Sequence, residues 1–182
     1  MHRADGHLVE RLGLVVPRPN AVQRMQQRLA ATRAVAWVFA HTLDPIDSVL
    51  SALTGGRLTI PRIAAGLPVV FLTTTGAKSG RPRRVPLLSI PVAGNVAVLG
   101  TNYGQPTTPG WVVNLEADAR ARLSYMGRTA AVRARPVSPS ELDGLFEEGA
   151  RIYGGYAVYR SRIRGRRVRG FILEPADDTW SR

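Results

Sequence analysis

Cysteine is absent from this chain, and its three histidines, His2, His7 and His41, all lie near the start. The lack of cysteine excludes disulfides, thiolate catalysis and cysteine-ligated zinc, and leaves the cellular compartment undecided. Because no histidine follows residue 41, the rest of the chain cannot build a Ser-His-Asp or Cys-His nucleophile system. A histidine-ligated zinc site is equally disfavoured there. We therefore expect no metal in this protein.

Acidic residues are missing from a long internal stretch. The chain of 182 residues has 13 acidic side chains, yet none lies between Asp47 and Glu116. This stretch carries six cations, which is half of the net charge of +12: Arg57, Arg62, Lys78, Arg81, Arg83 and Arg84. Paired carboxylates for acid–base catalysis are therefore excluded within it. Cations and hydroxyl groups without acids suit a large anionic cofactor that carries the chemistry itself.

Lysine is almost absent too. Lys78 is the only one among 25 basic residues, and it lies in the segment 72–87, LTTTGAKSGRPRRVPL. A turn of this composition offers backbone N–H groups, hydroxyl donors and cations, so it predicts a site for a phosphate or a carboxylate chain. The alternative is a basic turn on a solvated surface. A P-loop is excluded because Ala77 precedes Lys78 where that motif has glycine. A Rossmann fold is disfavoured because no Gly-x-Gly-x-x-Gly follows a strand.

Long apolar runs are missing as well, since the stretch 34–40 is far too short to cross a bilayer. Residues 1–19 lack the layout of a signal peptide and indicate a mobile leader. Residues 20–65 are predicted to form an N-terminal helical extension, with helices starting at Asn20 and at Asp44. We expect the first helix to pack on its own domain. The alternative is a helix on the membrane surface, with its arginines toward the headgroups.

After Gly66 the sequence changes to short runs rich in β-branched residues, which predict strands. The expected strands are 69–74, 83–90, 96–99, 121–126, 129–136 and 170–174. Short helices are expected over 109–115 and from the capping box at Ser138 and Glu141 toward Tyr153. This pattern predicts one α+β domain over 66–182, built on a closed or half-closed antiparallel barrel.

Three segments together resemble the deazaflavin (F420)-dependent nitroreductase family. The first is 72–83 followed by Pro86 and Leu87, the second combines 100–104 with 109–115, and the third is Tyr153, Tyr156 and Tyr159. Glu174-Pro175 matches the usual ending, so the resemblance runs from about Gly66 to Pro175. It implies a split β-barrel similar to FMN-binding folds, cofactor F420 rather than FMN, and an actinobacterial source.

The resemblance also implies a set of site residues. The cofactor's phosphate and glutamate tail would lie at Thr75, Lys78, Ser79 and Arg83. The deazaflavin ring would lie near Pro86, Leu87, Leu88, Thr101 and Asn102. Trp111 would pack near the ring or help to shape the pocket, and Asn114 would also bind the cofactor. Tyr153, Tyr156 and Tyr159 would orient the substrate or donate a proton, and their alternative role is core packing. Leu88 and Asn102 depart from the residues that many relatives carry at these positions, tyrosine and lysine.

The function implied is hydride transfer from F420H2 to a quinone, a nitroaromatic compound or an activated alkene. The rival interpretations are a non-catalytic F420 carrier and a basic nucleic-acid-binding module, although no nucleic-acid-binding motif is present. A dense cluster of arginines occupies 160–169 and is either a solvated basic segment or a contact for anionic lipid. We expect a cytoplasmic monomer or homodimer, with peripheral membrane contact at the inner face as the alternative.

Overall fold

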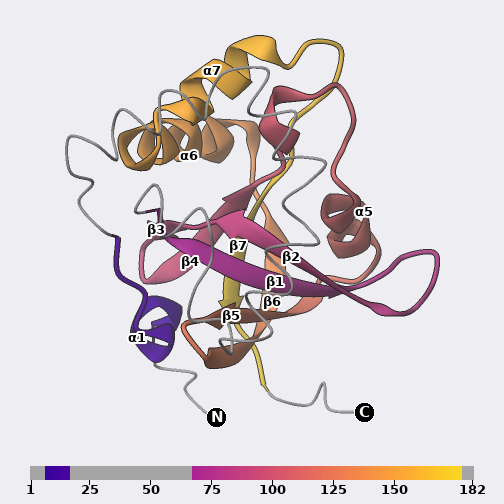
Figure 1. Cartoon of the computed structure of the whole chain (residues 1–182), viewed down its shortest axis with the longest axis vertical. Coiled ribbons are helices and arrows are strands. Elements are labelled where there is room, and N and C mark those ends of the chain that lie inside the picture. The colour runs from indigo at the N-terminus through magenta and orange to yellow at the C-terminus, as the bar shows by residue number, and fades with distance from the viewer. Residues whose placement is uncertain (1–6, 17–66, 178–182) are drawn as a thin grey trace.

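A single antiparallel sheet dominates the computed structural model, which describes residues 7–16 and 67–177 (Figure 1). Its strands are β1 (Val69–Thr75), β2 (Pro82–Leu88), β3 (Ile90–Val92), β4 (Asn95–Leu99), β5 (Arg120–Tyr125), β6 (Arg128–Pro136) and β7 (Gly170–Pro175). The helices are α1 (Leu8–Leu12), the 3-10 helix η1 (Asn102–Gly104), α5 (Gly110–Ala117), α6 (Pro139–Ile152) and α7 (Gly155–Arg162). The expected α+β class is confirmed.

The sheet curls into a half-barrel. Its strand order is β2-β1-β5-β6-β7-β4-β3, so β2 and β3 lie at opposite edges. These two edge strands are separated in sequence by Ser89 alone. Ser89 is fully buried, and both its N–H and its hydroxyl donate to the carbonyl of Pro68, at 3.0 and 2.7 Å. Because one residue joins the two edges, the sheet must bend round upon itself, which is the split-barrel arrangement expected from the sequence.

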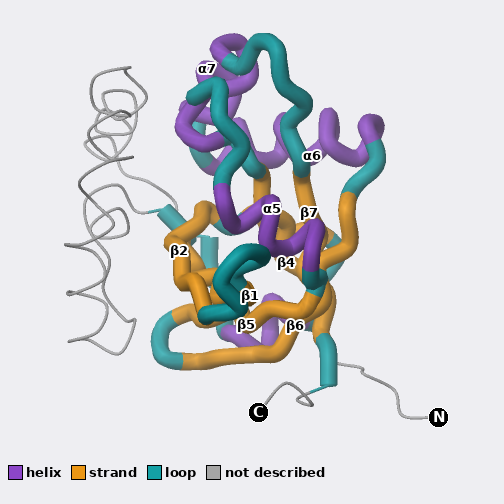
Figure 2. The backbone as a smooth tube through the Cα atoms, turned by 90° about the vertical axis from the view of Figure 1, so that its right-hand side faces the viewer, coloured by secondary structure: helices purple, strands orange, loops and turns teal. Residues whose placement is uncertain are grey.

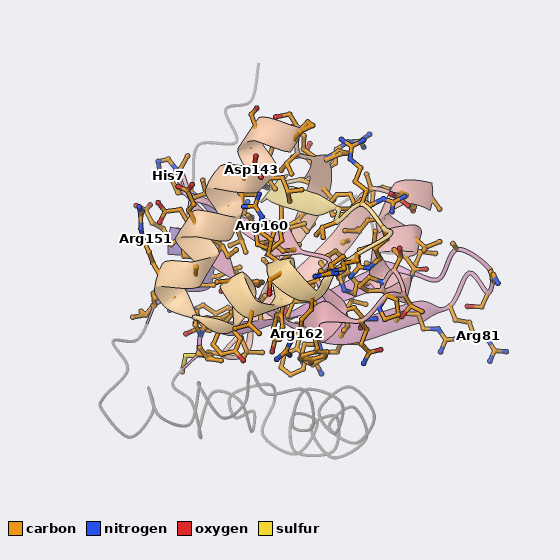
Figure 3. The ribbon with its side chains drawn as sticks, turned by 90° about the horizontal axis from the view of Figure 1, so that it is seen from above. His7, Arg81, Asp143, Arg151, Arg160 and Arg162 are labelled. Carbon is orange, nitrogen blue, oxygen red and sulfur yellow. The ribbon has the colours of Figure 1, made fainter. Side chains whose placement is uncertain are left out.

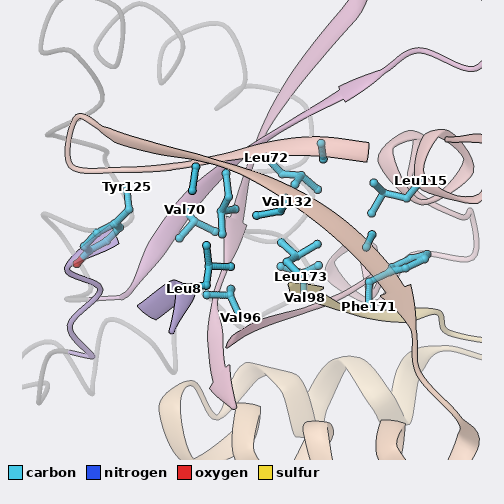
Figure 4. Packing of buried hydrophobic residues seen from close by; sticks show 14 of the residues in the cluster. Leu8, Val70, Leu72, Val96, Val98, Leu115, Tyr125, Val132, Phe171 and Leu173 are labelled. Atoms are coloured by element: carbon cyan, nitrogen blue, oxygen red, sulfur yellow. The ribbon is translucent and has the colours of Figure 1, made fainter. Parts of the chain in front are cut away.

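The concave face of the sheet encloses the main core. Alternate residues of the strands point inward, among them Val70 and Leu72 of β1 and Val132 of β6 (Figure 4). Such alternation is the period-2 pattern of a strand with one buried face. Leu8 and Leu12 of α1 complete this core and are essentially fully buried.

The position of α1 corrects one expectation. Residues 7–16 are not a mobile leader, because α1 packs against the sheet and Val9 N–H donates to Gly94 O at 3.0 Å. A short helix with two leucines four apart presents a small apolar face, and the sheet covers it. Gly94 has φ +79°, and a Cβ there would lie 1.8 Å from His7 Nδ1. The predicted helices of residues 20–65 lie outside the described residues.

A second core lies between the opposite face of the sheet and the pair α6 and α7. It contains apolar residues of the strands together with Leu145 and Phe146 of α6 and the three tyrosines. The predicted capping box is confirmed: Ser138 Oγ accepts from Glu141 N–H, and the Glu141 carboxylate accepts from Ser138 N–H. The prediction of one continuous strand over 83–90 is wrong, because the chain turns at Ser89 from β2 into β3. Among the described residues, no helix is long and apolar enough to span a membrane.

Candidate functional site

The turn between β1 and β2 projects from the sheet and carries Lys78, Ser79 and Arg81, all exposed (Figure 3, where Arg81 is labelled at its tip). Gly76 opens the turn, and a Cβ there would lie 2.7 Å from Ser79 Oγ, so the turn closes tightly only around glycine. Arg83 follows at the start of β2 and is exposed as well. Lys78 has no ion pair within the part of the chain that the structure describes. The turn therefore presents cations to solvent.

Most backbone N–H groups of this turn are already bonded within the protein, contrary to what the sequence suggested. Gly76 N–H donates to Arg81 O, and the N–H groups of Ser79 and Gly80 both donate to Gly76 O. Ala77 N–H donates to Asn114 Oδ1 at 2.9 Å, and Arg81 N–H lies 3.4 Å from Ser79 Oγ. Side-chain cations and hydroxyls, rather than a nest of amides, must therefore provide any attraction for an anion here.

Asn114 fixes the turn to α5. Its Oδ1 accepts from Ala77 in the turn, while its Nδ2 donates to Thr74 Oγ1 at 3.0 Å. Thr74 is fully buried at the end of β1, so both polar groups of the Asn114 amide serve the fold. Asn114 was expected to contact a cofactor, and in the structure both polar groups of its side chain are bonded within the protein.

The residues expected near a cofactor ring have different surroundings. Leu87 packs against the main core and Leu88 against the second core, while Pro86 is half-buried. Trp111 is buried in the main core, where its ring makes an edge contact with Phe171 at 6.0 Å between centroids. In the structure Trp111 is therefore a residue of the main core.

The loop after β4 has an unusual backbone. Asn102, Tyr103 and Gly104 have φ values of +47, +55 and +81°, a conformation that costs free energy for residues with a Cβ. Asn102 Nδ2 donates to both the carbonyl and the hydroxyl of Thr107, at 3.1 and 2.9 Å. Thr101 is buried, whereas Asn102 is partly exposed.

Arg166 holds this loop, a role that could not be predicted from the sequence. Its guanidinium donates to three backbone carbonyls, those of Gln105, Gly100 and Thr101, at 3.1, 3.0 and 2.8 Å. Partial burial lowers the pKa of Arg166, with the charge of Arg169 adding to the effect. The only signal in the sequence is that Arg166 belongs to the dense arginine cluster, where it cannot be told from its neighbours.

The three tyrosines lie together although they belong to two elements. Tyr153 follows the end of α6, while Tyr156 and Tyr159 lie on α7. All three are buried, and the hydroxyls of Tyr153 and Tyr159 are 3.0 Å apart. Gly155 makes room for this packing, because a Cβ there would lie 2.2 Å from Tyr153 Cε1.

Burial is the main cause that raises the pKa of each of these tyrosines above 10. Their hydroxyls therefore stay protonated throughout the neutral range and act as hydrogen-bond donors. Tyr103 of the loop makes an edge contact with Tyr159 at 6.2 Å between centroids, so the loop packs against the tyrosine cluster.

Several arginines of the cluster 160–169 are engaged inside the protein. Arg160 pairs with Asp143 of α6 (Figure 3). Arg169 pairs with Glu116, and Arg166 binds the loop. These contacts neutralise or occupy three of the cations that a lipid surface would need.

The candidate elements are contiguous along one side of the molecule. The β1–β2 turn is joined to α5 by Asn114, the loop leads into α5, and η1 packs against α7. Figure 2 views this side with α5 toward the reader and α7 above it. The structure thus connects the β1–β2 turn, the loop after β4 with α5, and the tyrosine cluster. The tyrosines lie beside α6, and the exposed cations lie in the β1–β2 turn. In the described residues, no group of acids and histidines could hold a metal.

Comparison with known proteins identifies relatives of this arrangement. Residues 49–175 match the family model of the F420H(2)-dependent quinone reductases, which starts upstream of the motifs seen in the sequence. F420H(2)-dependent quinone reductases of Mycobacterium tuberculosis and, as a putative one, of Mycobacterium bovis are 32% identical over 90 residues. This match covers 50% of the present chain and 60% of each relative, so the chain spans less than two thirds of their length.

Two solved structures share the fold. One is an F420-H2 dependent reductase with 30% identity and a TM-score of 0.54, covering 59% of this chain and 94% of that protein. The other, described as a domain-swapped dimer, has 28% identity and a TM-score of 0.56, and it covers 72% of this chain and 100% of its own.

Proposed function

This chain belongs to the F420H(2)-dependent quinone reductase family, and we propose that it is a reductase that uses F420H2 to reduce a quinone. The observation that carries the proposal is the family match over residues 49–175. Reduction by a bound hydride donor needs no protein nucleophile and no metal. This agrees with the part of the chain that the structure describes, where His7 is the only histidine.

The residues of the β1–β2 turn fit an anionic cofactor tail. Lys78, Arg81 and Arg83 are exposed at one end of the site, and no acidic residue lies anywhere in the described stretch 67–115. Lys78 and Arg83 would bind phosphate and carboxylate groups, and the hydroxyls of Thr75 and Ser79 would donate to them. Each charge-assisted hydrogen bond of this kind contributes roughly 1.5–3 kcal/mol.

The remaining residues would border the ring and the acceptor. Pro86, Leu87 and Leu88 give an apolar strand edge, and Thr101 and Asn102 give a polar loop that Arg166 holds in place. When bound, F420H2 supplies the hydride. The hydroxyls of Tyr153, Tyr156 and Tyr159 retain their protons and would orient an acceptor oxygen by hydrogen bonding.

The proposed hydride acceptors include compounds other than quinones. Besides quinones, nitroaromatic compounds and activated alkenes present an electron-poor centre and an oxygen that can accept a hydrogen bond. A homodimer is also proposed, because a solved relative is described as a domain-swapped dimer. Light scattering of the pure protein distinguishes this dimer from a monomer.

Binding and turnover of the pure protein test the function. F420 should quench tryptophan fluorescence with saturation, whereas FMN and NADPH should not. Menadione should then oxidise F420H2 at a rate proportional to enzyme concentration. Binding of F420 without oxidation by a panel of quinones would instead indicate a carrier. Tight binding of FMN without binding of F420 would exclude the proposal, as would binding of nucleic acid alone at physiological salt.

A further inference from the structure

Two buried hydrogen-bond donors lack a partner within the described part of the chain. They are Nη1 of Arg162, on α7, and Nε2 of Gln105, directly after η1 in the loop that follows β4. Buried polar atoms in native proteins are almost always paired, and leaving a charged donor without an acceptor is costly. Such an exception needs an explanation, and a ligand oxygen is one.

The two donors belong to neighbouring elements. Arg162 packs directly against the loop, because a Cβ on Gly104 would lie 3.3 Å from both Cβ and Cδ of Arg162. Gln105 is the next residue along, and its own carbonyl is bound by Arg166. The loop is thus held firmly beside the Arg162 side chain.

The same guanidinium borders the tyrosine cluster. Its positive charge is one of the influences that oppose the burial-driven rise in the pKa of Tyr153. The hydroxyl of Tyr153 is paired with that of Tyr159, and Tyr159 packs against Tyr103 of the loop. Arg162 therefore lies at the junction of α7, the loop and the tyrosines.

Three neighbouring arginines have partners within the described part of the protein, unlike Nη1 of Arg162. Arg160 is two residues away on α7, so it points about 200° around the helix, where it pairs with Asp143. Arg166 donates hydrogen bonds to three backbone carbonyls, and Arg169 forms an ion pair with Glu116. Arg162 Nη1 and Gln105 Nε2 can only donate. The missing partner must therefore be an acceptor, and the guanidinium favours one with negative charge.

We infer that Arg162 and Gln105, beside the Tyr153–Tyr159 pair, bind an anionic oxygen of the substrate. The chemical class is a planar electron-poor compound with an ionised hydroxyl or carboxylate group, such as a hydroxyquinone. Identification of this ligand as the hydride acceptor rests on the proposed function. The binding itself depends only on the arrangement of these side chains.

Calorimetric titration with two quinones tests the inference. The full-length protein, with oxidised F420 absent and then present, is titrated with 2-hydroxy-1,4-naphthoquinone, which is ionised at neutral pH, and with neutral menadione. The wild type should bind the anionic quinone more tightly. Arg162→Met should weaken that binding roughly ten- to hundredfold and leave menadione nearly unaffected. Arg162→Lys should keep part of the preference, because it keeps the charge without the planar fork.

Arg164→Met is the matched control, since Arg164 is exposed and its loss removes the same charge. It should bind both quinones like the wild type. Should Arg162→Met lower the melting temperature strongly, Arg162→Gln replaces it, because glutamine keeps a donor without the charge. A wild type that binds the two quinones equally, or binds neither, overturns the inference. A preference for the anionic quinone that survives in both Arg162→Met and Arg162→Gln also overturns it.

The two proposals fail separately. If the Arg162-dependent preference is present but no quinone oxidises F420H2, the proposed function is wrong and the anion site stands. If quinones are reduced and Arg162→Met binds the anionic quinone like the wild type, the inferred anion site is wrong and the proposed reductase function stands.

Discussion

Asn114 donates from Nδ2 to the hydroxyl of Thr74 at 3.0 Å, across 40 positions of sequence. The same amide accepts from Ala77 N–H, so a side chain on α5 holds both the end of β1 and the turn that follows. Thr74 is fully buried, which makes its partner hard to replace with water. The position of the exposed cations in this turn thus depends on a residue that need not touch a ligand.

Replacement of Asn114 by alanine should therefore affect both stability and binding. Asn114→Ala removes two hydrogen bonds and leaves the buried Thr74 hydroxyl without its donor, which should cost about 1–3 kcal/mol in the free energy of unfolding. Urea denaturation measures this change, and F420 affinity should fall because the turn is less well fixed. Val113→Ala is the control, since Val113 is exposed on the same helix. Equal stability of the two variants would show that the Asn114 bonds contribute nothing net.

Lys78 should contribute to cofactor affinity through its charge. Lys78→Ala should weaken F420 binding about tenfold at low salt and make affinity less sensitive to salt, because one charge-assisted contact is lost. Lys78→Arg should keep most of the affinity. Arg11→Ala removes the same charge from α1 and should leave binding unchanged. Fluorescence titrations at several salt concentrations decide the matter, and an unaltered affinity for Lys78→Ala would place the tail elsewhere.

Acid stability should depend on Glu141. The Arg135 guanidinium and then the Ser138 N–H lower the pKa of Glu141 from 4.5 to about 2. The unfolded chain therefore binds this proton more readily, so the contribution to stability is full above about pH 4.5 and is lost as the pH falls toward 2.

Glu141→Gln should lower the melting temperature at pH 7 and flatten its decline between these two pH values. Glu147→Gln is the control, because Glu147 is exposed on the same helix and has no ion pair among the described residues. Melting curves from pH 2 to 7 provide the measurement. A Glu141→Gln decline as steep as that of the wild type would contradict the assignment.

Local rules in the sequence predicted most of the fold but not the path of the sheet. The turn glycines Gly94 and Gly127 tolerate positive φ, and both have it, although Ala93 and Met126 before them have positive φ as well. The break at Ser89 could not be predicted, because nothing in the run VPLLSIPV marks a change of strand. Only the closure of the sheet explains it, since Ser89 is where the chain leaves one edge for the other.

The candidate site was predictable in position more than in detail. Charge and glycine content located the turn with Lys78, but they could not reveal that most of its amides are bonded within the protein. Leucine spacing in α1 was too short a pattern to indicate a packed helix. Similarly, composition cannot distinguish Arg160, Arg162 and Arg166, whose roles depend on the direction in which each leaves the chain.

Replacement of Arg166 tests whether this arginine has the structural role that its contacts with the loop indicate. Arg166→Met removes three hydrogen bonds to the carbonyls of Gly100, Thr101 and Gln105, which should destabilise the protein by about 1–3 kcal/mol. The larger effect should be local, because the positive φ values of Asn102 and Tyr103 are strained and need outside support. Hydrogen exchange of the loop amides should therefore accelerate more than that of the sheet.

Arg167→Met is the matched control for Arg166→Met. Arg167 is adjacent and exposed, so its loss removes the same charge from the same segment without removing a bond from the loop. Its loop amides should exchange like those of the wild type. If Arg166→Met leaves loop exchange unaltered while lowering global stability, the guanidinium supports the domain as a whole and the loop is held by its own contacts, chiefly the Asn102–Thr107 bonds.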